Sequence, residues 1–93
     1  MAKVRWSDHA MSRMREQAHY IALESSSSKT AWRWANDSFD EAEGLADFPN
    51  IGHCLPEFPS SPYLEILVRK SFRLIYRIDG EECLIVTVRR CSM

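Results

Sequence analysis

The chain has 93 residues, of which 45% are hydrophobic, and its formal net charge is −1 at pH 7. A chain of this length builds one modest core and leaves no room for a second core or a deep ligand chamber. The longest apolar runs are only a few residues, and the opening MAKVRW contains no apolar signal region. We therefore expect a single cytoplasmic domain over residues 1–93, without a membrane segment.

The cysteines give no sign of a disulfide framework or a metal site. There are three, Cys54, Cys83 and Cys91, and none lies in a CxxC or Cys/His ligand spacing. An odd number without ligand spacing favours neither disulfides nor zinc. The sequence predicts no metal and no cofactor.

The N-terminal quarter predicts a short strand followed by a helix. Residues 3–6, KVRW, form the strand, and Ser7 and Asp8 can cap the first N–H groups of a helix. An apolar stripe then recurs at steps of three and four residues, at Met11, Met14, Ala18 and Ile21. This spacing predicts a helix over about residues 8–24.

A second helix follows the polar break SSSSK at residues 25–29, whose last serines can cap it. Its apolar stripe is Trp32, Ala35, Phe39, Ala42 and Ala46, and Pro49 ends it. Because only a few residues join the two helices, they should pack as an antiparallel hairpin. Trp34 lies away from the centre of this stripe, so we expect it at the edge of the helix, as a candidate anchor for a partner.

The remainder predicts a loop and three strands. Residues 50–62 contain three prolines and one glycine without helical periodicity, which indicates a long loop that is either functional or a cover. The runs YLEILV, FRLIYRI and CLIVTV are typical of strands, and the Asp79–Glu82 turn joins the last two. The prediction is an α+β fold, β-α-α-β-β-β, with the helical hairpin packed on a twisted antiparallel sheet.

Positive charge concentrates at the C-terminal end of the chain. Residues 1–62 hold six Lys/Arg against nine Asp/Glu, which gives −3, and residues 63–93 hold six against four, which gives +2. Strand alternation places Phe72, Leu74 and Tyr76 on one face and Arg73 and Arg77 on the other. We expect these arginines on the face away from the helices, where they bind an anionic partner or are simply solvated strand residues. An exposed cation there would contribute only about 0–1 kcal/mol to stability.

Four stretches, in order, resemble the RelE/ParE superfamily of toxins from bacterial type II toxin–antitoxin modules. They are RWSDHAMSRMREQAHYIA, FPNIGHCLPEF, FRLIYRID and VTVRR. The four motifs in this order are specific, and the resemblance covers nearly the whole chain. The resemblance implies a plasmid-stabilisation type of toxin that inhibits growth and is neutralised by a cognate antitoxin protein.

The resemblance also implies one of two activities. RelE-like members cleave mRNA on the ribosome, whereas ParE-like members inhibit DNA gyrase. The family's central arginine corresponds to Arg73, and its C-terminal arginine corresponds to Arg89 or Arg90. These three would be catalytic only in the RelE-like case.

The preceding strand favours the ParE-like branch. The nuclease type carries lysines there, where this chain has Leu64, Glu65 and Ile66, and apolar side chains transfer no protons. We expect a ParE-like gyrase inhibitor that is not an enzyme, with Arg69, Arg73, Arg77 and Trp34 binding partners. The alternatives are a metal-independent endoribonuclease and an inactive relative that only binds its antitoxin.

Overall fold

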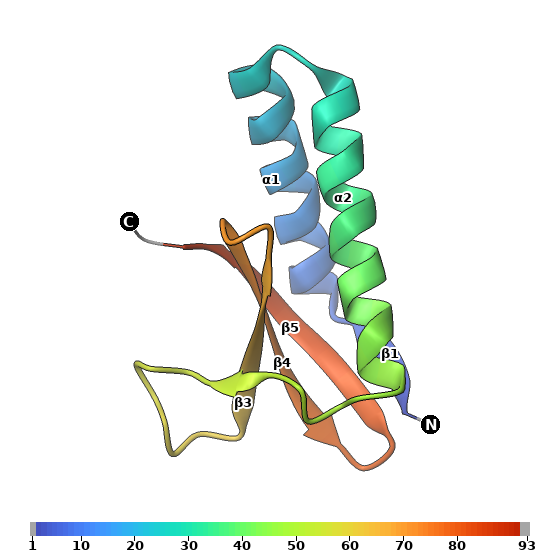
Figure 1. Cartoon of the computed structure of the whole chain (residues 1–93), viewed down its shortest axis with the longest axis vertical. Helices are drawn as coiled ribbons and strands as arrows, with labels where there is room; N and C mark the ends of the chain where they lie inside the picture. The colour runs from blue at the N-terminus through green and yellow to red at the C-terminus, as the bar shows by residue number, and fades with distance from the viewer. Residues whose placement is uncertain (1, 92–93) are drawn as a thin grey trace.

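The helical hairpin lies against one face of a five-stranded sheet (Figure 1). The structure, a computed structural model, describes residues 2–91. Its elements are β1 (Lys3–Trp6), α1 (Asp8–Ser25), α2 (Ser28–Glu43), the 3-10 turn η1 (Gly44–Ala46), β2 (His53–Cys54), β3 (Tyr63–Val68), β4 (Phe72–Asp79) and β5 (Glu82–Arg90). The strand order across the sheet is β1-β5-β4-β3-β2. The predicted α+β fold is confirmed.

The helix starts follow the predicted capping residues. Ser7 Oγ accepts a hydrogen bond from the Ala10 N–H at 3.0 Å, and Ser27 Oγ accepts one from the Thr30 N–H at 3.1 Å. Each cap satisfies one of the N–H groups that a helix start leaves free. The second helix ends earlier than predicted, because η1 follows directly after Glu43 and only then does the chain reach Pro49.

The sheet is mixed, so the prediction of an antiparallel sheet holds only in part. β3, β4 and β5 form the predicted antiparallel meander, but β1 pairs with β5 in parallel. A parallel neighbour needs a long connection, which the two helices and the meander supply. The stretch predicted as a loop also contains β2, which pairs with Leu64 and Glu65 of β3.

One core lies between the hairpin and the sheet, and it corrects the predicted face of α2. Trp34 is 3% exposed and packs against the tilted Phe72 ring with ring centroids 4.8 Å apart, whereas Trp32 is 67% exposed. The buried row is Ala31, Trp34, Ser38 and Ala42. The sequence pattern did not predict Ser38 as a core position, because serine counts as polar. In the structure its hydroxyl donates to the Trp34 carbonyl at 2.9 Å, so the side chain can be buried.

None of the helices within residues 2–91 is both long and apolar enough to cross a membrane.

Candidate functional site

An ion cluster lies on the sheet face away from the helices. Phe72 and Leu74 of β4 belong to the core on the other face, so Arg73 between them points away from it. Arg73 pairs in register with Leu67 of β3 and with Arg89 of β5. Two like charges directly opposite each other destabilise a sheet, so this pair of arginines needs compensating anions.

Glu57 and Glu65 supply those anions. The Arg73 guanidinium donates to both oxygens of Glu57, with Nη2 2.7 Å from Oε2 and Nη1 3.2 Å from Oε1. Nη1 also donates to Glu65 Oε2 at 2.7 Å, and Arg89 Nη1 lies 3.8 Å from Glu57 Oε2. These four residues are called the Arg73 cluster below. Its two positive and two negative charges cancel.

The Arg73 cluster is only partly open to solvent. The Arg73 side chain is 14% exposed and that of Glu65 is 12% exposed, while Glu57 lies at the rim. A shallow hollow beside them is lined by Glu57, Glu65, Leu67, Arg73 and Cys91. The predicted facing of Arg73 is correct. Of the two alternatives for this residue, the solvated strand residue is wrong, because the side chain is mostly buried and paired with two carboxylates.

Both Arg73 and Glu57 are ionised at neutral pH. The hydrogen bond from Arg73, and then a backbone hydrogen bond, lower the pKa of Glu57 to about 2. The hydrogen bonds to Glu57 and Glu65 raise the pKa of Arg73 despite its partial burial. A general acid or base works best with a pKa near the operating pH. Neither group therefore suits proton transfer near pH 7.

Acid is expected to remove the contribution of Glu57 to stability. Its folded-state pKa of about 2 lies below the usual 4.5, so the folded state holds the ionised form more tightly than the unfolded state does. The difference in unfolding free energy between the wild type and Glu57→Gln should be largest above pH 4.5 and shrink as the pH falls toward 2. Urea unfolding across this range measures it. Glu43→Gln, which removes one charge from an exposed part of α2, is the charge-matched control.

Loss of Arg73 is expected to destabilise the fold, in contrast to the sequence-based expectation. Arg73→Ala leaves Glu65 largely buried without its partner, which should cost about 1–3 kcal/mol. Arg69→Ala is the matched control, because Arg69 makes an ion pair with Asp37 in which both side chains are 45% exposed; its cost should be about 0–1 kcal/mol. Denaturant unfolding compares the two variants, and equal costs would contradict a structural role for Arg73.

Arg69 and Arg90 do not join the Arg73 cluster. Arg69 lies in the β3–β4 turn with a positive φ of 53° and contacts Asp37 of α2. Arg90 lies with its guanidinium carbon 4.6 Å from the centre of the Tyr20 ring on α1, and 3.7 Å separate its Nη2 from Glu24 Oε2. Both arginines therefore hold the helical hairpin to the sheet.

Arg77 shares the face of Arg73 by strand alternation, two positions beyond the buried Ile75. Its Nε is buried and has no hydrogen-bond partner among the described residues. Trp34, the remaining predicted partner residue, is buried in the core. Arg73 and Arg89 are thus brought together as a site, with Arg77 on the same face.

Sequence reasoning missed Glu57 and gave Glu65 no structural role. Glu57 lies 16 positions before Arg73, in the proline-containing loop, so no local periodicity connects the two. One signal was present: Glu57 is the only Asp, Glu, Lys or Arg between residues 50 and 62. Glu65 was named only as one of three residues that stand where the nuclease type has lysines, and in the structure it is an ion-pair partner of Arg73.

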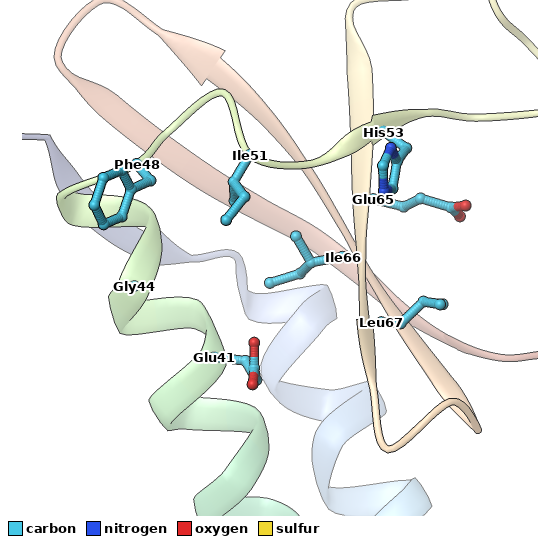
Figure 2. A pocket seen from close by; sticks show the side chains of 8 residues that line it. All are labelled: Glu41, Gly44, Phe48, Ile51, His53, Glu65, Ile66 and Leu67. Atoms are coloured by element: carbon cyan, nitrogen blue, oxygen red, sulfur yellow. The ribbon is translucent and has the colours of Figure 1, made fainter.

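A second feature is an apolar groove between the end of α2 and β3 (Figure 2). Its volume is about 290 Å³, and its lining is Glu41, Gly44, Phe48, Ile51, His53, Glu65, Ile66 and Leu67. Ile51 and Ile66 point into it, whereas Glu65 and Leu67 point to the other side of β3 (Figure 2). Phe48 and Ile51 are each more than half exposed.

The groove adjoins an open strand edge. β2 pairs with β3 only at Leu64 and Glu65. Within residues 2–91, no strand pairs with Ile66–Val68 on the side away from β4. Free backbone N–H and C=O groups at such an edge can pair with another chain.

The described part of the chain holds no cluster of three or more His, Cys, Asp or Glu side chains suited to a metal ion. Cys54, Cys83 and Cys91 are all free thiols.

Comparisons with known proteins place this architecture among the toxins of type II toxin–antitoxin modules. A solved structure described as the chromosomal ParDE system of P. aeruginosa matches with a TM-score of 0.84, over 99% of this chain and 98% of that chain, at 16% identity. No curated protein sequence matches significantly. The model of the ParE toxin family of type II parDE systems matches residues 4–93. The chain belongs to the ParE toxin family, and this family implies an antitoxin as partner.

Proposed function

We propose that this chain inhibits bacterial growth by binding DNA gyrase, and that a cognate antitoxin neutralises it. Membership of the ParE toxin family is the main support, since the parDE module couples a toxin with an antitoxin. The proposed activity is inhibition by binding, without a chemical step carried out by the toxin.

The observation that carries the choice of a binding inhibitor is the surroundings of Arg73. Directly opposite it on β3 is Leu67, and the next residue of β3 on that face is Glu65. Arg73 is already bonded to two carboxylates. A nuclease centre needs cations that stabilise a phosphate transition state and groups that transfer protons. A neutral cluster beside a leucine offers neither.

The antitoxin is proposed to occupy the apolar groove beside α2. Amphipathic segments bind by laying an apolar face into such a groove, or by adding a strand to an open sheet edge. Here the exposed Phe48 and Ile51 lie next to the unpaired edge at Ile66–Val68. One extended antitoxin segment can use both features.

A charge placed in the groove should weaken the toxin–antitoxin complex. Ile51→Glu puts a carboxylate where the antitoxin would bury apolar side chains, and the expected loss of affinity is at least about tenfold. Leu23→Glu is the matched control, because Leu23 is also exposed but lies on α1 outside the groove. Co-expression with the adjacent small reading frame, followed by size exclusion and calorimetry, measures both variants. Equal affinities would place the antitoxin elsewhere.

Gyrase supercoiling, measured beside ribosome-dependent mRNA cleavage, tests the activity. The purified chain should inhibit supercoiling, leave mRNA intact, and lose its inhibition when the antitoxin is added. Cleaved mRNA with normal supercoiling would instead identify a RelE-like endoribonuclease. No effect in either assay and normal growth, with soluble protein confirmed, would identify an inactive relative that binds its antitoxin.

A further inference from the structure

Glu57 reaches the Arg73 cluster from a loop that is weakly attached to the rest of the domain. In the segment 55–61, only Leu55 is buried, and residues 56–60 are all exposed. The backbone hydrogen bonds of this segment are local turns, from Phe58 N–H to the Leu55 carbonyl and from Ser61 N–H to the Phe58 carbonyl. The contacts of Glu57 with Arg73 and Arg89 are therefore the main polar attachment of the loop tip to the sheet.

Glu65 differs from Glu57 in this respect. It lies within β3, paired with Ile75 on one side and His53 on the other, so its backbone stays beside Arg73 as long as the sheet is intact. If the loop moves away, Arg73 and Arg89 remain with Glu65 alone. The site then carries one net positive charge, and a guanidinium fork loses a bidentate carboxylate partner.

We propose that Arg73 and Arg89 form a binding site for a carboxylate of an acidic protein segment, and that Glu57 occupies this site in the free chain. The loop acts as an internal competitor, because a partner's carboxylate can replace Glu57 with the same geometry and the same charge. Glu65 stays in place and limits the site to one further negative charge. This arrangement favours an acidic peptide over a nucleic acid, whose closely spaced phosphates would meet Glu65 on a chain of net charge −1.

The exposed side chain of Leu67 adds an apolar contact next to this site. Leu67 is 50% exposed and lines the hollow beside the Arg73 cluster. A peptide that displaces Glu57 would meet this side chain. The binding of an acidic segment is therefore supported by apolar contacts as well as by charge.

Binding of a labelled hexaglutamate peptide at low salt tests the proposal, with hexaglutamine and a six-nucleotide RNA as comparison probes. Opening the site with Glu57→Gln should tighten hexaglutamate binding about two- to tenfold, because the apparent affinity rises with the fraction of open site. Glu43→Gln makes the same charge change on α2 and should alter the affinity less than twofold. Hexaglutamine should not bind.

Arg89→Gln keeps the test independent of folding, since Arg89 is 56% exposed and its loss should leave the domain intact. Glu57→Gln combined with Arg89→Gln should abolish the gain in affinity. The proposal is overturned if Glu57→Gln behaves like Glu43→Gln, if the gain survives loss of Arg89, or if no probe binds. It is also overturned if the RNA binds Glu57→Gln more tightly than hexaglutamate does.

The inference rests on the proposed function only in taking the partner to be a protein. The assay uses the toxin alone, so its outcome is independent of gyrase inhibition.

Discussion

Replacing Trp34 by alanine should lower the free energy of unfolding by about 3–5 kcal/mol. The side chain is almost fully buried and packs against Phe72, so its removal leaves a large cavity between α2 and the sheet. The indole N–H is buried without a hydrogen-bond partner among the described residues. Its removal eliminates an unsatisfied donor, which places the expected cost toward the lower end of this range. Circular dichroism in urea measures the change without depending on tryptophan fluorescence.

Trp32→Ala is the matched control for this variant. Trp32 lies on the same helix but is 67% exposed, so its loss should change stability by no more than about 0.5 kcal/mol. A domain of this size has little stability in reserve. Trp34→Ala should therefore be partly unfolded at 37 °C while Trp32→Ala is not. The opposite order would restore the sequence-based view, in which Trp32 faces the core and Trp34 lies at the edge.

The two tryptophans show where sequence patterns lose their precision. The starts of both helices were predictable, because Ser7 and Ser27 cap them through local contacts. The rotation of α2 about its axis was not, because Ser38 is buried through a hydrogen bond within its own helix and therefore counts as polar in any pattern. The buried row and the predicted stripe share Ala42, and their centres differ by only about a fifth of a turn at 3.6 residues per turn.

The candidate site could also be predicted from the sequence only in part. Strand alternation placed Arg73 on the correct face, since that depends only on period two within β4. Its partners were not predictable, because Glu57 arrives from a loop and Glu65 from another strand. An arginine with two carboxylate partners is a structural ion pair as much as a binding residue. Composition alone cannot distinguish these cases, since both require a cation on the strand.

Tyr76 shows how the loop after η1 is fixed. The sequence predicted packing for this residue, and it is fully buried in the core. Its hydroxyl also donates to the Pro49 carbonyl at 2.7 Å and accepts from the Gly52 N–H at 3.0 Å. These two bonds hold residues 49–52 against the sheet, and this segment carries Ile51 of the groove. Tyr76→Phe should therefore loosen the segment that carries Ile51 and also lower the free energy of unfolding of the domain.

Gly52→Ala should destabilise the domain by about 2–4 kcal/mol, combining overpacking with weakened hydrogen bonds. A Cβ at this position would lie 2.6 Å from Tyr76 Oη and 2.9 Å from the Glu65 carbonyl oxygen. The tyrosine is fully buried and the carbonyl belongs to β3, so neither neighbour can move easily. Gly44→Ala is the control, because nothing lies within 4 Å of its Cβ and its φ is −59°. That change should stabilise the domain by about 0.4–1 kcal/mol.

A double-mutant cycle assigns the cost of Gly52→Ala to its cause. If the tyrosine hydroxyl is the main obstacle, Gly52→Ala should cost less in a Tyr76→Phe background than in the wild type, because removing Oη removes the closest contact. The residual cost would then come from the ring carbon Cε1 of residue 76 at 2.8 Å and from the Glu65 carbonyl at 2.9 Å, which both backgrounds share. Equal costs in the two backgrounds would show that the aromatic ring and β3, and not the Tyr76 hydroxyl, set the limit on this position. The segment next to the groove would then be confined by the ring packed in the core together with the backbone of the sheet edge.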